Sequence, residues 1–260
     1  MRRKTDDKHP ALSLIIPFFN EARHMQQFLT MLNETRFDLK TEFIFVDDGS
    51  TDGSAEVIRQ HKMRRSYVLL TIPRNTGKGA AVRCGIAAAR GDIIGIQDAD
   101  LEYDIADINR IVKPLAEGSC EVVFGSRFAP AAANVHRTLH RLANRTLTKF
   151  SNLLSGLSLT DMETCYKFGL REIMQNLQLQ SERFGIEPEI TAKLARLKIR
   201  IREVPVTYYP RSYIEGKKIT WRDGLAALWH LTYFNILMPR KRFFKRSLPR
   251  SFLPDETKWL

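Results

Sequence analysis

The first half of the chain alternates short apolar runs with longer amphipathic stretches. The apolar runs are rich in β-branched and aromatic residues, which is typical of buried strands. They cover Leu12 to Pro17, Glu42 to Asp48, Tyr67 to Pro73, Asp92 to Asp98 and Glu121 to Ser126. Helices are expected over Glu21 to Glu34, Gly53 to His61, Gly77 to Ala89 and Asp104 to Leu115. This βαβα succession predicts an α/β fold with a mostly parallel sheet that helices cover on both faces.

Polar residues follow every predicted strand at the point where it ends. The five segments are "PFFNE", "DDGSTD", "PRNTGKG", "DADLE" and "GSRF". Because ligands of open α/β sheets bind beyond the carboxyl ends of the strands, we expect the charged residues of these segments along one rim. They are Glu21, Asp47, Asp48, Asp52, Arg74, Lys78, Asp98, Asp100 and Arg127. Ser50, Thr51 and Asp52 are expected mainly to cap helices, a role that such residues favour.

Four acidic residues, Asp98, Asp100, Glu102 and Asp104, follow the apolar run Ile93 to Ile96. Crowded carboxylates repel one another and are costly to desolvate without a partner, so a cation is expected among them. Asp98 and Asp100 are two residues apart, which on a continuing strand directs both to one side. Such carboxylates suit Mg²⁺ or Mn²⁺. A DxD pair alone also fits a solvated acidic turn, but its place at the end of an apolar strand favours the metal.

The segment "RNTGKGAAV" looks like a phosphate-binding loop but lacks the glycine spacing of a P-loop. Gly77 and Gly79 would let the backbone approach an anion at a helix N-terminus, with Lys78 beside it. Alternatively, the glycines only form the turn and Lys78 is solvated. The pattern leaves both interpretations open.

A second cationic segment, Asn134 to Leu154, is expected to be a helix or a broken helix. Arg137, Arg141 and Arg145 recur every four residues and so lie along one face. These like charges repel mildly unless an anion such as a phosphate bridges them. A solvated basic face is the alternative, because such stripes are common on surface helices.

Composition adds a strong positive charge to this picture. The chain has 260 residues, 43% of them hydrophobic, and 41 Lys and Arg against 29 Asp and Glu, a net charge of +12. The length fits one large α/β domain with an appendage, and the charge predicts an anionic partner. Three cysteines, Cys84, Cys120 and Cys165, are far apart and form no CxxC pair, so a reducing cytosol is the expected compartment.

The C-terminal region has the composition of a membrane-surface segment. Leu225, Leu228, Trp229, Thr232 and Ile236 recur at helical spacing. The segment Leu225 to Met238 is too short and polar to be predicted as a membrane span.

Basic residues then surround an aromatic pair, Phe243 and Phe244. An anionic membrane surface is the partner expected for this segment, with both phenylalanines in lipid. The alternative is a helix packed on the domain with a disordered tail. We therefore expect a flexible N-terminus (1–10), a catalytic domain (11–218), an amphipathic interfacial helix (219–238) and a basic tail (239–260).

Several motifs together resemble family 2 glycosyltransferases with the GT-A fold, a Rossmann-like α/β architecture. They include "IIPFFNE", "FVDDGSTDGS", "RNTGKGAAVRCGI", "ARGDIIGIQDADLEYD", "VVFGSRF", "LTDMETCYK", "FGIEPEITAKLAR" and "YYPRSYIEGKKITWRDG", between Leu12 and Gly224. The branch that the chain resembles is the polyprenyl-phosphate sugar synthases, typified by dolichyl-phosphate mannose synthase and its glucose-transferring and bacterial relatives.

The resemblance implies roles for individual residues. The nucleotide would be held by Pro17, Phe19, Glu21, Val46 and Asp48. Asp98, Ala99 and Asp100 would engage the donor phosphates and the metal, with Glu102 as a further ligand. Arg127 would bind phosphate, and Arg211 and Lys218 resemble a basic pair near the membrane-facing end of the site.

We therefore expect a metal-dependent inverting transferase, peripheral on the cytoplasmic face of a membrane, that moves a sugar from a UDP- or GDP-sugar to a polyprenyl phosphate. Such an acceptor is substantially dianionic near neutrality and needs no general base. The nearest rival uses a sugar hydroxyl acceptor, for which Asp161 or Glu163 would be the base. A basic nucleic-acid-binding protein explains the charge but not the acidic rim, and no nucleic-acid motif is present, so no nucleic-acid partner is expected.

Overall fold

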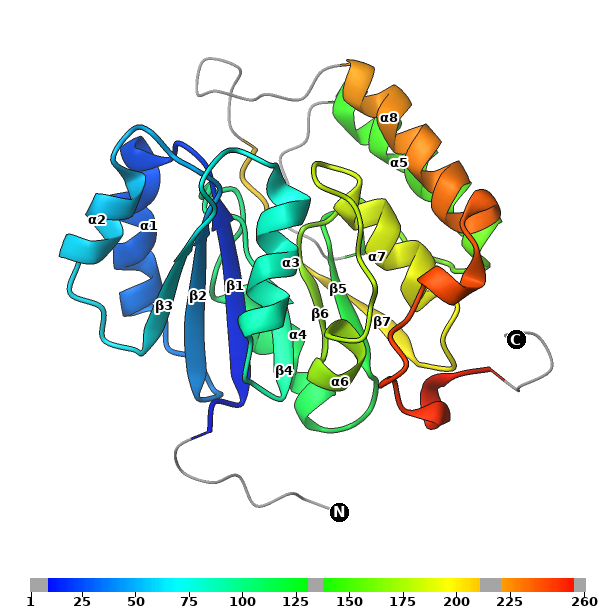
Figure 1. Cartoon of the computed structure of the whole chain (residues 1–260), viewed down its shortest axis with the longest axis horizontal. Helices are drawn as coiled ribbons and strands as arrows, with labels where there is room; N and C mark the ends of the chain where they lie inside the picture. The colour runs from blue at the N-terminus through cyan, green and yellow to red at the C-terminus, as the bar shows by residue number, and fades with distance from the viewer. Residues whose placement is uncertain (1–8, 131–137, 211–220, 255–260) are drawn as a thin grey trace.

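The computed structural model describes residues 9–130, 138–210 and 221–254 (Figure 1). One seven-stranded sheet has the order β3-β2-β1-β4-β6-β5-β7. The strands are β1 (Leu12–Phe18), β2 (Thr41–Asp47), β3 (Tyr67–Thr71), β4 (Ile93–Ile96), β5 (Val122–Ser126), β6 (Lys167–Leu170) and β7 (Ile201–Pro205). β6 is antiparallel to both of its neighbours, and every other pair is parallel. The mostly parallel α/β fold predicted from the sequence is confirmed.

The helices pack on both faces of the sheet. They are α1 (Ala22–Glu34), α2 (Ser54–Gln60), α3 (Lys78–Ala88), α4 (Asp107–Ala116), α5 (Thr138–Ser155), α6 (Arg171–Met174), α7 (Ile186–Leu194) and α8 (Trp221–Thr232). Along β1, Leu14 and Ile16 pack with α1 and α4, whereas Ile15 packs with α3 and α7. Alternate side chains of one strand therefore enter two separate cores, which is why the inner strands are apolar throughout.

The C-terminal helix forms a second layer beyond the sheet. α8 lies beside α5 and also packs against α7 (Figure 1). It continues into a π-helical turn, Tyr233–Leu237. Within the described part of the chain, no helix combines the length and the hydrophobicity needed to cross a bilayer.

The segment after this turn folds back onto the rest of the described chain, and the expectation that Phe243 enters lipid is wrong. Phe243 is buried against Phe234 and Met238, so it is not available to enter lipid, whereas Phe244 is half-buried. The Phe243 carbonyl accepts a hydrogen bond from Gln178 N, and the Lys245 amide donates to Asn176 O. Backbone hydrogen bonds to the 176–178 segment thus hold this stretch in place. Its basic residues are exposed: Arg240, Lys241, Arg242, Lys245, Arg246 and Arg250.

Gly95 is required by the packing of the central strands. A Cβ at this position of β4 would lie 2.0 Å from Cε1 of Phe168 on the neighbouring strand. We therefore expect Gly95→Ala to lower the free energy of unfolding by about 1–3 kcal/mol, the usual cost of overpacking a core. Gly224→Ala on α8, where nothing lies within 4 Å, is the matched control and should be neutral or stabilising. Urea unfolding of both variants measures the difference, and equal stability would contradict the assignment.

Candidate active site

The loops after β1 and β2 bind each other through capping interactions. Asp52 accepts hydrogen bonds from Ala22 N at the start of α1 (2.9 Å) and from Ser54 N at the start of α2 (3.0 Å). Burial alone would raise the pKa of Asp52, but hydrogen bonds from Ser54 and Ala22 outweigh it and lower that pKa. The Ser50 hydroxyl accepts from Asn20 N. Asp52 therefore binds the first amides of two helices, as expected of a capping residue, whereas Ser50 joins the two loops and caps no helix among the described residues.

Asp48 holds the loop after β3. Its carboxylate accepts from the amides of Thr76 (2.9 Å) and Gly77 (2.7 Å), directly before α3. A Cβ on Gly77 would lie 2.4 Å from the Glu182 carbonyl oxygen, which also accepts from Ala80 N. Backbone of the 181–183 segment thus covers the first turn of α3. Close packing against this segment requires both glycines, which is neither of the two interpretations that the pattern left open.

Lys78, expected either near a phosphate or in solvent, instead lies between two carboxylates. Its Nζ is 2.8 Å from Oδ2 of Asp98 and 2.8 Å from Oε1 of Glu187. Burial alone would lower the pKa of Lys78, but the charges of Asp98 and Glu187 outweigh it and hold that pKa well above its usual value. A cation is therefore present among the acidic residues after β4, and it is supplied by the chain itself.

Asp98 and Asp100 lie beyond the end of β4, because the strand stops at Ile96 and not at Asp98 as predicted. Strand geometry therefore does not direct the side chains of Asp98 and Asp100 to one side. Leu101 has a positive φ of 61°, which turns the chain sharply after Asp100. The two carboxylates are nonetheless close in the chain and partly exposed at the rim.

These carboxylates fit a hard divalent ion that also binds substrate phosphates, because their oxygens are the ligands that Mg²⁺ and Mn²⁺ prefer. Glu102 accepts a hydrogen bond from the Tyr208 hydroxyl. No cluster of three or more His, Cys, Asp or Glu that could hold a metal exists among the residues described. The role of Glu102 as a ligand stays a prediction.

Arg127 and Asp161 form a buried, two-pronged ion pair. Nε and Nη2 of Arg127 donate to Oδ2 (2.7 Å) and Oδ1 (2.8 Å) of Asp161, which is fully buried. The guanidinium also lies 5.1 Å from the ring centre of Tyr208. Burial would lower the pKa of Arg127, but Asp161 outweighs it and raises that pKa well above its usual value. Asp161, one of the two candidate bases, is thus committed to orienting a cation.

Glu163, the other candidate base, has no hydrogen-bond partner at Oε1 among the described residues, although that oxygen is buried. The pKa of Glu163 is raised to about 7, mainly because the carboxyl group is desolvated and also because Glu187 is negatively charged. Lys167 is buried nearby in the charge network, and its Nζ donates to Met162 O (2.7 Å). Desolvation lowers the pKa of Lys167 to about 8. Burial thus moves the pKa of Glu163 up and the pKa of Lys167 down, each toward neutrality.

The remaining predicted site residues divide into three sets. Pro17, Val46 and Ala99 are buried, so their side chains offer little surface to a nucleotide. Phe19 and Glu21 are half-buried just before α1, and Arg141 is exposed on α5. Three lie outside the described residues, namely Arg137, Arg211 and Lys218.

Sequence analysis did not single out Glu187, Tyr208 or Lys167. The sequence offered one signal for Glu187: it is one of two acidic residues, two apart, at the start of the segment that forms α7. The structure shows that both acidic residues are buried. The ion partner of Glu187 is Lys78 at the start of α3, which is distant in sequence, and the sequence alone does not indicate this pairing.

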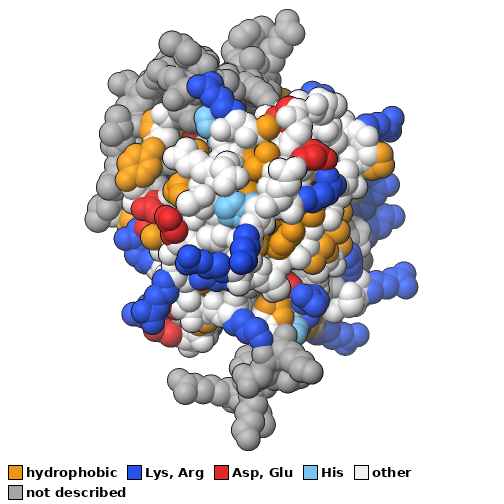
Figure 2. All heavy atoms as spheres, turned by 90° about the vertical axis from the view of Figure 1, so that its left-hand side faces the viewer, with side chains coloured by type: hydrophobic (Ala, Val, Ile, Leu, Met, Phe, Trp, Pro, Cys, Tyr) orange, Lys and Arg blue, Asp and Glu red, His pale blue; other side chains and the backbone are white. Residues whose placement is uncertain are grey.

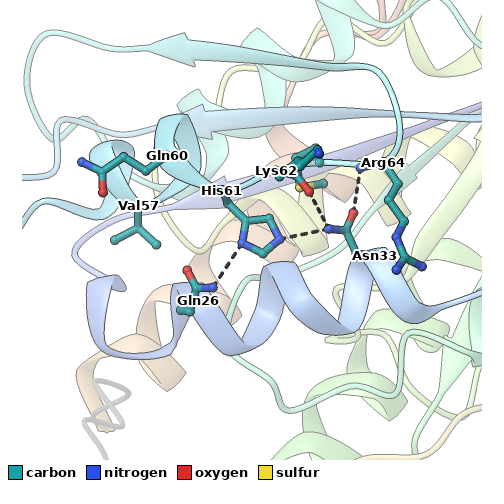
Figure 3. A pocket seen from close by; sticks show the side chains of 8 residues that line it. Gln26, Asn33, Val57, Gln60, His61, Lys62 and Arg64 are labelled. Carbon is teal, nitrogen blue, oxygen red and sulfur yellow. Dashed lines mark hydrogen bonds between the residues drawn. The ribbon is translucent and has the colours of Figure 1, made fainter.

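A separate hollow of about 870 Å³ lies between α1 and α2. Figure 3 shows His61 at its centre, with ring nitrogens close to the amides of Gln26 (3.2 Å) and Asn33 (3.0 Å). No predicted site residue lines it. Figure 2 shows this side of the molecule, where Lys and Arg side chains are spread widely and acidic ones are few. The positive charge of the chain is therefore not confined to its C-terminal segment.

The amino-acid sequence is similar to those of several known proteins. The chain is 28% identical over 202 residues to glycosyltransferase AglJ of Haloferax volcanii, an overlap of 77% of this chain and 64% of AglJ. It is 31% identical over 236 residues to the dolichyl-phosphate beta-glucosyltransferase ALG5A of Trichomonas vaginalis, covering 80% and 68% of the two chains. The chain thus spans less than two thirds of AglJ.

Solved structures share the fold at lower identity. Glucosyl-3-phosphoglycerate synthase of Mycobacterium tuberculosis, in complex with Mn²⁺, UDP-glucose and glycerol 3-phosphate, superposes with a TM-score of 0.65 at 18% identity. The match covers 87% of this chain and 80% of that one. The sequence profile described as glycosyl transferase family 2 matches residues 13–178. The chain therefore belongs to glycosyl transferase family 2, as its motifs indicated.

Proposed function

We propose that this enzyme transfers a sugar, with inversion, from a UDP- or GDP-sugar to a polyprenyl phosphate. Relatives named as dolichyl-phosphate beta-glucosyltransferases support the lipid phosphate acceptor, and a neighbour crystallised with Mn²⁺ and UDP-glucose supports the donor class. Asp98 and Asp100 would hold Mg²⁺ or Mn²⁺. The bound ion would stabilise the negative charge that develops on the departing diphosphate.

The observation that carries this proposal is the pairing of Asp161 with Arg127. A hydroxyl acceptor needs a carboxylate that is free to take its proton, whereas Asp161 is fully buried and binds Arg127 through both oxygens. A phosphate dianion already carries its attacking charge. The acceptor oxygen would form a bond to the anomeric carbon while the bond from that carbon to the nucleoside diphosphate breaks, and no proton moves.

The chain's own residues would position the charges for this step. Asp161 and Tyr208 fix the Arg127 guanidinium, which is then preorganised to bind a phosphate oxygen. Asp48 fixes the loop that ends at Lys78. Preorganised groups need no rearrangement when charge develops on the leaving group, which is the main source of such electrostatic stabilisation.

An apolar face next to basic residues supports action at a lipid surface. Trp229 and Ile236 are 58% and 61% exposed on α8 and the turn after it. α5, which lies beside α8, exposes Arg141, Arg145 and Lys149. Exposed apolar and cationic groups together are typical of a face that binds an anionic bilayer. We infer peripheral attachment through this face on the cytoplasmic side of a membrane, where three free cysteines would stay reduced.

The direct test is product identification. Purified protein is incubated with Mg²⁺ or Mn²⁺, a panel of UDP- and GDP-sugars, and either polyprenyl phosphate or the corresponding polyprenol, and lipids are analysed by mass spectrometry. A glycosylated polyprenyl phosphate with no product from the polyprenol supports the proposal. Sugar transfer to hydroxyl acceptors only would refute it.

One observation favours the hydroxyl-acceptor alternative, namely the state of Glu163. A buried carboxyl group with a pKa of about 7 and an oxygen without a hydrogen-bond partner has the properties of a general base at neutral pH. If the acceptor is a hydroxyl, Glu163→Gln should lower turnover by a factor of about 100 or more. Transfer to a phosphate should largely survive that substitution.

Asp100→Asn should abolish transfer and leave the fold intact. The substitution removes a charge that would bind the metal, but it keeps the side-chain oxygen that accepts from Glu102 N. Without metal, the thermal midpoint should hold or rise, since repulsion among carboxylates is relieved. Turnover at saturating Mn²⁺ and a thermal scan in EDTA measure the two effects, and near-normal turnover would exclude Asp100 as a ligand.

Glu163 should also make stability depend on pH. Because its pKa is raised from 4.5 to about 7, the unfolded chain ionises first, and the folded state loses stability as pH rises through this window. Glu163→Gln mimics the neutral form, so it should stabilise the protein at pH 8 by at most about 3 kcal/mol relative to its effect at pH 5. Urea unfolding at both pH values tests this, with the exposed Glu34→Gln as control. A difference independent of pH would mean that Glu163 is ionised throughout.

Membrane binding should depend on the exposed face of α8. Replacing Trp229 and Ile236 by Ser removes apolar area from the contact and should weaken binding to anionic vesicles by about tenfold or more, with little loss of stability. Val68→Thr on the edge strand β3, which is also partly exposed, is the matched control and should bind normally. Vesicle co-sedimentation at low and high salt gives both affinities. Equal binding of the Ser variant and the native chain would remove α8 from the contact.

A further inference from the structure

We propose that Lys78 is an internal counter-cation for Asp98, which it yields to a divalent metal ion while it stays bound to Glu187. This inference rests on the metal site of the proposed function and adds a residue that sets how tightly the metal binds. Lys78 would then be a positioning residue that keeps the site electrically balanced before the donor enters.

The geometry of the three side chains carries the argument. Nζ of Lys78 is equidistant, at 2.8 Å, from one oxygen of Asp98 and one of Glu187. The exposed fractions of the three side chains are 17%, 22% and 8%, so Asp98 is the member most open to solvent. An incoming ion therefore reaches Asp98 from the rim, while Glu187 remains the inner partner of the ammonium.

The backbone at Lys78 cannot follow its side chain. Asp48 binds the Gly77 amide, and a Cβ at Gly79 would lie 2.3 Å from the Ser181 carbonyl oxygen. α3 and α7, which carry Lys78 and Glu187, pack into the same core on one side of the sheet (Figure 1). On the side of Lys78, rotation of its flexible four-carbon stem is the motion that separates Nζ from Asp98.

The exchange has a direct consequence for metal affinity. An ammonium and a divalent ion on one carboxylate repel each other, so Lys78 weakens metal binding to the nucleotide-free protein. The diphosphate of a donor adds negative charge and further ligands, which offset this repulsion. The metal would thus bind tightly only together with the nucleotide. Among the salt bridges of the described residues, Asp98 has no cationic partner other than Lys78.

Two substitutions of opposite effect test the proposal. Without nucleotide, Lys78→Met should bind Mn²⁺ about tenfold more tightly than the native chain, because the competing charge is gone. Glu187→Gln keeps Lys78 paired with Asp98 alone and should bind Mn²⁺ several-fold more weakly. The readout is the electron paramagnetic resonance signal of free Mn²⁺ at pH 7, which needs no catalysis.

A double-mutant cycle separates this mechanism from a general charge effect. If Glu187 acts through Lys78, Glu187→Gln should have a much smaller effect in the Lys78→Met background. Lys167→Met, which removes a buried cation that does not contact Asp98, is the matched control and should change Mn²⁺ affinity little.

The outcomes distinguish the inference from the proposed metal site. Unchanged or weaker Mn²⁺ binding by Lys78→Met overturns the counter-cation. If Asp98→Asn still abolishes binding in that case, the metal site itself stands. If neither the native chain nor any variant binds Mn²⁺ even when UDP is added, both the counter-cation and the metal site fall. Glu187→Gln retains the Lys78–Asp98 pair, so it decides the question even if Lys78→Met does not fold.

Discussion

The compensation of buried carboxylates by cations of the same chain is the interaction on which this site depends. Strand ends that bind phosphate and metal must carry charge, and charge taken out of water is costly unless it is paired. Here Lys78 lies between Asp98 and Glu187, and Arg127 binds Asp161 through two hydrogen bonds. The pairs join segments that are distant in sequence, so they organise the rim while they neutralise it.

The sheet was predictable from the sequence, because its inner strands alternate between two apolar cores and so appear as continuous apolar runs. β1 to β5 were each predicted with small errors at their ends. β6 and β7 were missed. β6 pairs antiparallel between β4 and β5, a long-range arrangement without a local signal, and β7 is a half-exposed edge strand. Hydrophobic periodicity indicates burial but not strand order.

The candidate site was predicted as a set of residues rather than as a set of contacts. Asp98, Lys78, Arg127 and Asp161 were each predicted as site residues, and the structure shows that they form two ion pairs with one another. In the C-terminal segment, the sequence predicted exposure correctly for the basic residues but not for Phe243. Phe243 is buried by backbone pairing with the 176–178 segment, which composition does not indicate.

The central claim is that the chain's own cation occupies Asp98 until a metal replaces it. Anomalous diffraction from crystals grown with Mn²⁺ and UDP tests this directly, because it locates the ion and the Lys78 side chain in one experiment. The account predicts Mn²⁺ on Asp98, with Nζ of Lys78 moved away from Asp98 and still hydrogen-bonded to Glu187. An ion bound elsewhere, or Mn²⁺ on Asp98 with Lys78 unmoved, would contradict it.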